Sequence, residues 1–124
     1  MENRYLFRGK TISGNWVQGL LASKDDKWYI SNKAGAPFAY EIRSESICQC
    51  TGLKDKNGKL IWENDIVKDD VIYGVVKWDD ANAMYIIDDR DDGYQIYSGW
   101  WHEVDVIGNT FDNTELLEGS HDGE

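Results

Sequence analysis

The feature that most constrains this chain is its division into short segments in which apolar and polar residues alternate. In the clearest segment, VIYGVVKWD (71–79), the even positions from Ile72 to Trp78 share one face and the odd positions share the other. A period of two is typical of a half-buried β-strand. Long helical periodicity is absent, and twelve glycines against a single proline supply many turn positions. The sequence therefore predicts an all-β fold.

Turn residues separate the other expected strands. A hairpin is expected across Lys24-Asp25-Asp26, between 15–23 and 27–33. Asn57-Gly58 is the strongest turn signal, because both residues tolerate the positive φ of a type I′ turn, and it leads into the expected strand LIWENDIV (60–67). Asn113 is expected to cap a helical turn in TELLEG (114–119). Further strands are expected at 4–9, 38–43, 83–88, 94–101 and 103–111.

These elements predict a small antiparallel barrel with an additional β-sheet lobe and a short C-terminal helical turn. A chain of 124 residues fits one domain. Within it we expect an N-terminal sheet lobe over about 1–50 and a barrel lobe over about 51–118, followed by a frayed tail at 119–124.

Composition indicates a protein of the cytoplasm. No apolar run approaches the ~20 residues that span a bilayer, and MENRYLFRGK has no apolar signal core, so neither a membrane location nor export is expected. Cys48 and Cys50 are two residues apart, so on a strand their side chains project in parallel and do not bridge. Two lone thiols suit a reducing compartment.

The charge is unevenly distributed along the chain. Residues 1–60 carry ten basic and six acidic side chains, a balance of +4, whereas residues 61–124 carry three and seventeen, a balance of −14. The sum of −10 argues against nonspecific nucleic-acid binding, which depends on neutralising phosphates. The asymmetry indicates either a charged interaction face or two halves that complement each other within one fold, and we prefer the second interpretation.

Two charged stretches are candidate sites. Lys54, Lys56 and Lys59 surround the Asn57-Gly58 step and could hold an anion, but a hairpin pairs most of its backbone N–H groups, so a structural turn is preferred. The acidic stretch DDRDDG (88–93) lacks EF-hand spacing and is read as a solvated turn. A looser cation site would draw on Asp79, Asp80, Asp88, Asp89, Asp91 and Asp92.

Metal and nucleophile chemistry has weak support. Cys48 and Cys50 with His102 could form a metal site, but one Cys-x-Cys without a second ligand pair is a poor zinc signal, and His121 lies in the tail. Buried strand cysteines are the preferred interpretation. No third group orients a nucleophile, so we expect no catalytic residue, no metal, no cofactor and no enzymatic activity.

The aromatic residues are the strongest indication of an interaction surface. Six tryptophans and seven tyrosines exceed the needs of one small core. Tyr94, Tyr97, Trp100 and Trp101 follow the acidic stretch, and the adjacent tryptophans would point to opposite faces of a strand. They either form a protein-binding patch or fill and cover the barrel interior.

Three blocks of the sequence resemble the YopX family of small phage and prophage proteins. They are YLFRGK near the start, CTGLKDKNGKLIWENDIV (50–67) and VIGNTFDNTELLEG (106–119), so the resemblance covers nearly the whole chain. Two positions depart from the family pattern: Asn64 replaces the usual Gly, and Thr114 replaces a frequent Pro. Asn tolerates left-handed backbone, so the turn at Asn64 is expected to survive. The signature positions, expected to set backbone geometry, are Gly52, Leu53, Asp55, Asn57, Gly58, Asp65, Ile66, Gly108 and Asn109.

The resemblance implies an all-β fold with an SH3-like barrel and supplies no catalytic residue. It favours a noncatalytic phage accessory protein that binds a host or phage protein or a second copy of itself. One alternative is an acidic decoy that imitates DNA on a host protein. The other is a small-barrel binder of single-stranded nucleic acid, which the negative charge of the chain opposes.

Overall fold

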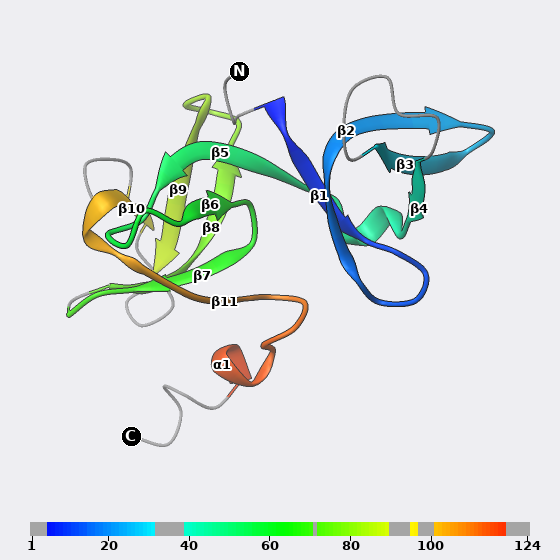
Figure 1. Cartoon of the computed structure of the whole chain (residues 1–124). Helices are drawn as coiled ribbons and strands as arrows, with labels where there is room; N and C mark the ends of the chain where they lie inside the picture. Colours follow the sequence, from blue (N-terminus) through cyan, green and yellow to red (C-terminus); the bar gives the residue numbers. More distant parts are fainter. Residues whose placement is uncertain (1–4, 32–38, 71, 90–94, 97–100, 119–124) are drawn as a thin grey trace. The chain divides into compact units, whose positions relative to one another are not determined.

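The computed structural model describes residues 5–31, 39–70, 72–89, 95–96 and 101–118 (Figure 1). The chain divides into two compact units, Met1–Gly52 (unit 1) and Leu53–Glu124 (unit 2). Among the described residues the structure is mostly β, with two antiparallel sheets and one short α-helix. The sequence prediction of a β-rich fold is therefore confirmed.

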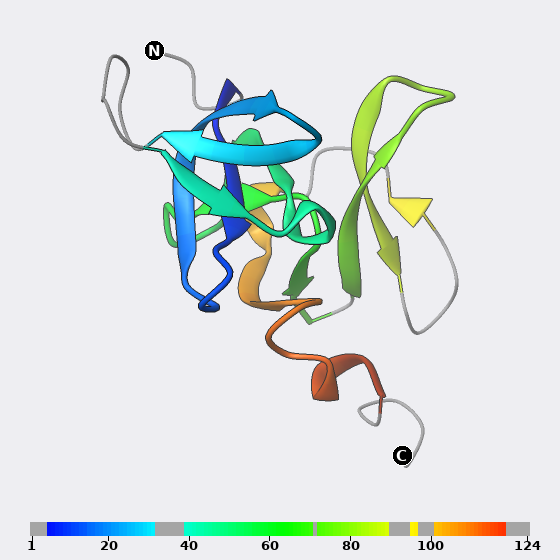
Figure 2. The same ribbon diagram turned by 90° about the vertical axis from the view of Figure 1, so that its right-hand side faces the viewer.

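Unit 1 is a meander of short antiparallel strands followed by a 3₁₀ turn. Figure 2 shows its strands curling around one another. The elements are β1 (Phe7–Lys10), β2 (Trp16–Lys24), β3 (Lys27–Ser31), β4 (Tyr40–Ile42), η2 (Ser44–Ser46) and the start of β5 (Cys48–Lys54). The hydrogen-bonded order is β4-β3-β2-β1-β5, and β6 (Leu60–Trp62) extends this sheet to six strands.

Two contacts bring the last strand of the unit 1 meander back toward the first. Thr11 and Ile42 form an isolated bridge, and the backbone N–H of Arg43 donates to Lys10 O at 2.8 Å. Gly9 permits this approach, because a Cβ at that position would lie 2.8 Å from Ile42 Cδ1. The curl encloses a small core that includes the fully buried Ile30.

Unit 2 contains the second sheet, in the order β10-β9-β8-β7-β11. Its core cluster is apolar and sealed, and consists of Ile61, Val67, Ile72, Val76, Ile87 and Val104. The Tyr73 hydroxyl donates to Leu116 O at 2.5 Å and attaches the C-terminal helix to the sheet. The elements are β7 (Asp65–Lys68), β8 (Tyr73–Asp79), β9 (Met84–Asp89), β10 (Gln95–Ile96), η3 (Trp101–Glu103), β11 (Asp105–Asn109) and α1 (Glu115–Glu118).

The predicted barrel does not close among the described residues of unit 2. Where the turn after β5 meets β11, two hydrogen bonds replace a strand ladder. The N–H of Lys56 donates to Val104 O at 3.0 Å, and the N–H of Val106 donates to the Asp55 carboxylate at 3.0 Å. Because a side-chain carboxylate supplies one of the two acceptors, the hydrogen-bonded ladder is interrupted here.

The prediction that LIWENDIV (60–67) forms a single strand is wrong. The segment divides into β6 and β7, which belong to different sheets. Asn64 adopts φ 71° between them, and its N–H donates to Val76 O at 2.8 Å. The turn therefore survives with Asn at the position where the family usually has Gly, because Asn tolerates the left-handed region.

In the part of the chain that the structure describes, no helix has the length and apolar character needed to cross a membrane.

Candidate functional site

The Asp55 side chain organises the signature block in unit 2. It is 4% exposed, and both carboxylate oxygens accept backbone hydrogen bonds. One oxygen receives the N–H groups of Asn57 and Lys59, each at 2.9 Å, and the other receives the N–H of Val106 at 3.0 Å. Asp55 therefore joins the β5–β6 turn to β11, across more than fifty residues of sequence.

These contacts also set the protonation of the Asp55 carboxyl. Burial raises its pKa, but the backbone donors of Val106, Lys59 and Asn57 and the positive charge of Lys59 outweigh burial. The pKa consequently lies below the ordinary value for aspartate. Asp55 is an anion whose hydrogen bonds are used inside the fold, which suits a structural role.

The prediction of a type I′ turn at Asn57-Gly58 is wrong. Gly58 has φ 81°, but Asn57 does not have a positive φ. Gly58 N donates to Asp55 O at 3.0 Å, and Asp55 N donates to Lys59 O at 2.9 Å. This pattern is a type I turn followed by a glycine bulge. The Asp55 side chain favours it, because it accepts from the N–H groups of Asn57 and Lys59 within the turn.

The other signature positions also make backbone or packing contacts. Gly52 has φ 81° and Leu53 packs against the unit 2 core. Asp65 is 2% exposed and its carboxylate accepts from Trp62 N at 2.8 Å, while Ile66 is fully buried. The Asp65 contact shapes the turn between β6 and β7, and Asp65 and Ile66 are buried.

Gly108 and Asn109 shape the chain after β11. A Cβ on Gly108 would lie 2.5 Å from Asn113 Oδ1, so this position requires a residue without one. Asn109 Oδ1 accepts from the N–H groups of Phe111 and Asp112, each at 2.9 Å. The helical turn itself is confirmed as α1, but its expected side-chain cap is wrong, because Asn113 Oδ1 accepts from Asn109 N at 3.1 Å instead.

Of the four aromatic interaction candidates, the structure describes Trp101. Tyr94, Tyr97 and Trp100 lie outside the described residues. Trp101 belongs to the 3₁₀ turn η3 and not to a strand, so the prediction of opposite strand faces is wrong for it. It is half-buried and packs against the unit 2 core, which is the core-filling alternative.

The lysine turn is not built to bind an anion. Lys54, Lys56 and Lys59 are exposed, but the N–H groups of Lys56 and Lys59 already donate to Val104 O and to Asp55. An anion-binding loop needs free consecutive N–H groups. The preference for a structural turn therefore agrees with the geometry.

The acidic candidates do not form one group. Asp79 pairs with Met84 at one end of the β8–β9 hairpin, whereas Asp88 pairs with Val75. Val75 and Asp79 are four positions apart along the strand, which corresponds to about 13 Å. Asp88 therefore cannot share a cation site with Asp79 or Asp80. Asp91 and Asp92 lie outside the described residues.

Cys48, Cys50 and His102 do not come together as ligands of one metal ion. Cys48 and Cys50 form no disulfide and are fully buried, as the sequence predicted, and His102 is exposed on η3. Within the described ranges, no three His, Cys, Asp or Glu side chains gather closely enough to hold a metal ion. His121 lies outside these ranges.

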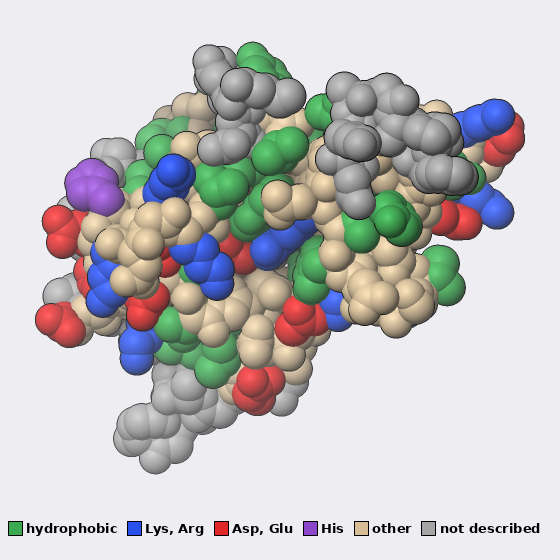
Figure 3. Space-filling model, in the orientation of Figure 1, with side chains coloured by type: hydrophobic (Ala, Val, Ile, Leu, Met, Phe, Trp, Pro, Cys, Tyr) green, Lys and Arg blue, Asp and Glu red, His purple; other side chains and the backbone are tan. Residues whose placement is uncertain are grey.

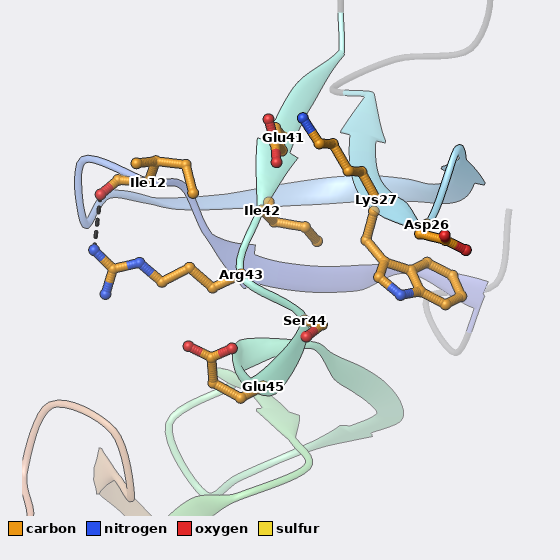
Figure 4. A pocket seen from close by; sticks show the side chains of 9 residues that line it. Ile12, Asp26, Lys27, Glu41, Ile42, Arg43, Ser44 and Glu45 are labelled. Atoms are coloured by element: carbon orange, nitrogen blue, oxygen red, sulfur yellow. Dashed lines mark hydrogen bonds between the residues drawn. The ribbon is translucent and has the colours of Figure 1, made fainter.

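Sequence reasoning missed an open cleft in unit 1, of about 310 Å³, shown in Figure 4. Trp28 and Ile12 are 37% and 61% exposed, and the buried Ile42 lies between the polar residues. The charged residues of the rim carry both signs. The lining consists of Ile12, Asp26, Lys27, Trp28, Glu41, Ile42, Arg43, Ser44 and Glu45.

Strand pairing builds this cleft. Trp28 on β3 lies opposite Ile42 on β4, which brings residues 26–28 beside residues 41–45. Arg43 Nη2 donates to Ile12 O at 2.7 Å, as Figure 4 shows. Ser46 is buried, donates to Arg43 O at 2.7 Å and accepts from Lys10 N at 2.7 Å, which fixes η2 below the cleft. The alternating stretch EIRSE was the available sequence signal, but it does not reveal its partner strand.

The apolar exposure of unit 1 extends beyond the cleft. Tyr40 is 46% exposed and lies opposite the buried Ile30 in the β3–β4 ladder. Trp28 and Tyr40 thus flank two buried isoleucines on one face of this strand pair. On the face drawn in Figure 3, basic and acidic side chains are interspersed, with hydrophobic side chains between them.

The fold and these surfaces define a small two-unit β protein whose signature residues shape turns and whose first unit carries an apolar cleft with a charged rim. The model of the YopX protein family matches residues 10–118. The chain therefore belongs to the YopX family, and the sequence resemblance is confirmed. A search of curated proteins finds no match.

Proposed function

We propose that this protein is a noncatalytic phage or prophage accessory protein that binds a partner protein through the cleft of unit 1. The observation that carries the proposal is the combination of an exposed tryptophan with a mixed-charge rim. Trp28 and Arg43 belong to residue types that are enriched among the residues that dominate binding energy. An apolar centre with a polar rim is the usual anatomy of a protein interface.

The composition of the cleft supports binding over catalysis. The described residues that line it include neither a cysteine nor a histidine, and Ser44 therefore has no histidine base among them. Arg43 is committed to the Ile12 carbonyl, and the Ser46 contacts hold η2 in place. Such a preorganised surface loses little conformational entropy when a partner binds.

Affinity capture from phage-infected bacterial cells, followed by binding measurements with the purified partner, tests the proposal. We expect Trp28→Ala to weaken that partner's binding by about tenfold or more, which is the effect of removing a central aromatic anchor. Lys77→Ala is the matched control, because this exposed side chain lies on unit 2 and should leave binding unchanged. Equal binding by wild type and Trp28→Ala would refute the cleft as the interface.

The same measurements separate two other outcomes. If the partner is a second copy of the chain, light scattering will show a dimer that Trp28→Ala dissociates. If the partners are DNA-binding proteins that salt releases and Trp28→Ala retains, the acidic decoy becomes the better function. Unit 2 gives that alternative its support, since residues 53–124 carry six basic and eighteen acidic side chains, a balance of −12.

A further inference from the structure

A second surface lies at the end of the β8–β9 hairpin in unit 2. Trp78 and Tyr85 are directly opposite in the ladder, with ring centroids 5.0 Å apart and planes inclined at 71°. The preceding pair on the same face, Val76 and Ile87, is sealed in the core. Trp78 nevertheless remains 45% exposed. The row of core residues therefore ends in two nearly perpendicular aromatic rings, one of them open to solvent.

Hydrogen bonds hold this end of the hairpin in one arrangement. The indole N–H of Trp78 donates to Asp80 Oδ1 at 2.6 Å. The Asp79 carboxylate accepts from Ala81 N at 3.1 Å and from Asn82 Nδ2 at 2.8 Å. The indole orientation and the loop are thus set before any ligand arrives, which lowers the entropic cost of binding.

The chemistry of this surface suits a cation. The faces of aromatic rings carry negative potential, and tryptophan is the best partner for an ammonium or guanidinium group. The carboxylate that accepts the indole N–H adds negative charge beside the ring. Lys77 is the neighbouring cation on the strand, but it lies on the opposite face of β8. The net charge of −12 on unit 2 attracts a basic partner to this region.

We propose that Trp78, Tyr85 and Asp80 form a recognition site for an arginine or lysine side chain in a basic segment of a partner protein. The cation would stack on the exposed face of Trp78, while the remaining oxygen of Asp80 accepts one of its N–H groups. A metal ion fits less well, because aromatic rings are not ligands and both Asp79 oxygens already accept hydrogen bonds. This site is independent of the unit 1 cleft.

The test is a titration of the whole protein with hexa-arginine, followed by the indole N–H signals in ¹H–¹⁵N spectra. Trp78→Phe assigns the Trp78 signal by its disappearance. We expect that signal to shift on binding, and Trp78→Ala and Asp80→Asn each to weaken hexa-arginine binding by about tenfold, corresponding to one cation–π or charge contact. Asp80→Asn leaves the aromatic pair intact, so its effect does not depend on refolding of the hairpin.

Three controls distinguish a site from general charge attraction. Asp70→Asn removes one exposed carboxylate elsewhere in unit 2 and should leave affinity nearly unchanged. Trp28→Ala removes an exposed tryptophan from unit 1 and should have no effect. Hexa-glutamine should not bind. Equal losses for Asp70→Asn and Asp80→Asn, or unchanged binding by Trp78→Ala, would overturn the proposal.

Discussion

The two units each contain a hairpin turn built on aspartate, and the two turns use it in opposite ways. In unit 1, Asp25 and Asp26 form a two-residue loop between Lys24 and Lys27 and adopt φ 55° and 67°. Two positive φ values are the mark of a type I′ turn, and both side chains are exposed. In unit 2, the turn begins at the buried Asp55, whose carboxylate accepts three backbone N–H groups.

The difference shows that the residue pair with the best turn propensity does not determine the turn type alone. Asn57-Gly58 is the preferred pair for a type I′ turn, yet it lies in a type I turn with a bulge. Asp25-Asp26 is a weaker pair, yet it adopts the type I′ geometry. A buried side-chain acceptor outweighed the local preference in one turn, and a two-residue connection imposed the geometry in the other.

The largest expected effect comes from neutralising the buried aspartate. Asp55→Asn should lower the free energy of unfolding by about 2 kcal/mol. The NH₂ group of the new asparagine cannot accept a hydrogen bond, and it would face either the Val106 N–H or the two N–H groups of the turn. Asp25→Asn is the matched control and should change it by less than about 0.5 kcal/mol, since Asn tolerates positive φ at an exposed site. Urea unfolding of both variants measures the contrast. Similar losses for the two would contradict the distinction between the turns.

A smaller effect is expected from acid. The folded-state pKa of Asp55 lies below its unfolded value, so the unfolded state binds protons first. The stabilisation from Asp55 should therefore be complete at neutral pH and be lost as pH falls below about 5 and through the folded-state pKa. Urea unfolding at pH 7 and pH 3 should show a larger loss for wild type than for Asp55→Asn. Asp25→Asn should follow wild type, and parallel curves for all three would refute the assignment.

The smallest effects on stability are expected from substitutions that remove the glycine of one turn or add a glycine to the other. Gly58 has φ 81° with open space around its missing Cβ, so Gly58→Ala should cost about 1 kcal/mol through backbone strain alone. Asp26→Gly should instead stabilise the protein by about 0.5 kcal/mol, because Gly is preferred there in a type I′ turn. Lys56→Ala, at a position without positive φ, serves as the neutral control. Thermal unfolding ranks the three, and a destabilised Asp26→Gly would break the comparison.

Much of the local structure could be predicted from the residues. Alternation predicted a strand at 71–79, where the structure has β8 (Tyr73–Asp79), and a hairpin across Lys24-Asp25-Asp26. The pattern near the end predicted the short helix. The signature residues were assigned to backbone geometry, and the contacts of Asp55, Gly108 and Asn109 are of that kind. Most of these features depend on neighbours within a few positions, which a sequence displays directly, whereas the hydrogen bond from Val106 to Asp55 joins residues 51 positions apart.

The candidate surfaces could not be predicted in the same way. The cleft of unit 1 exists because β3 pairs with β4 and brings Trp28 opposite Ile42. In unit 2, the pairing of the exposed Trp78 with the partly buried Tyr85 depends on the register of β8 and β9. Trp101 was a candidate for the interaction surface because it is one of two adjacent tryptophans. It lies in a 3₁₀ turn and packs against the core. Whether a side chain is exposed depends on which strands pair and in which register, and the sequence of a single strand shows neither.

The sequence by itself determined the β-rich class, the charge asymmetry, the family and most strand positions, because period, composition and motif are local or summed properties. The tertiary structure decided which turn has two residues with positive φ, which strands pair, and which tryptophans are exposed to solvent. The physical reason is that these outcomes depend on contacts between distant residues, such as Asp55 with Val106, whose free energy exceeds the small differences in local preference.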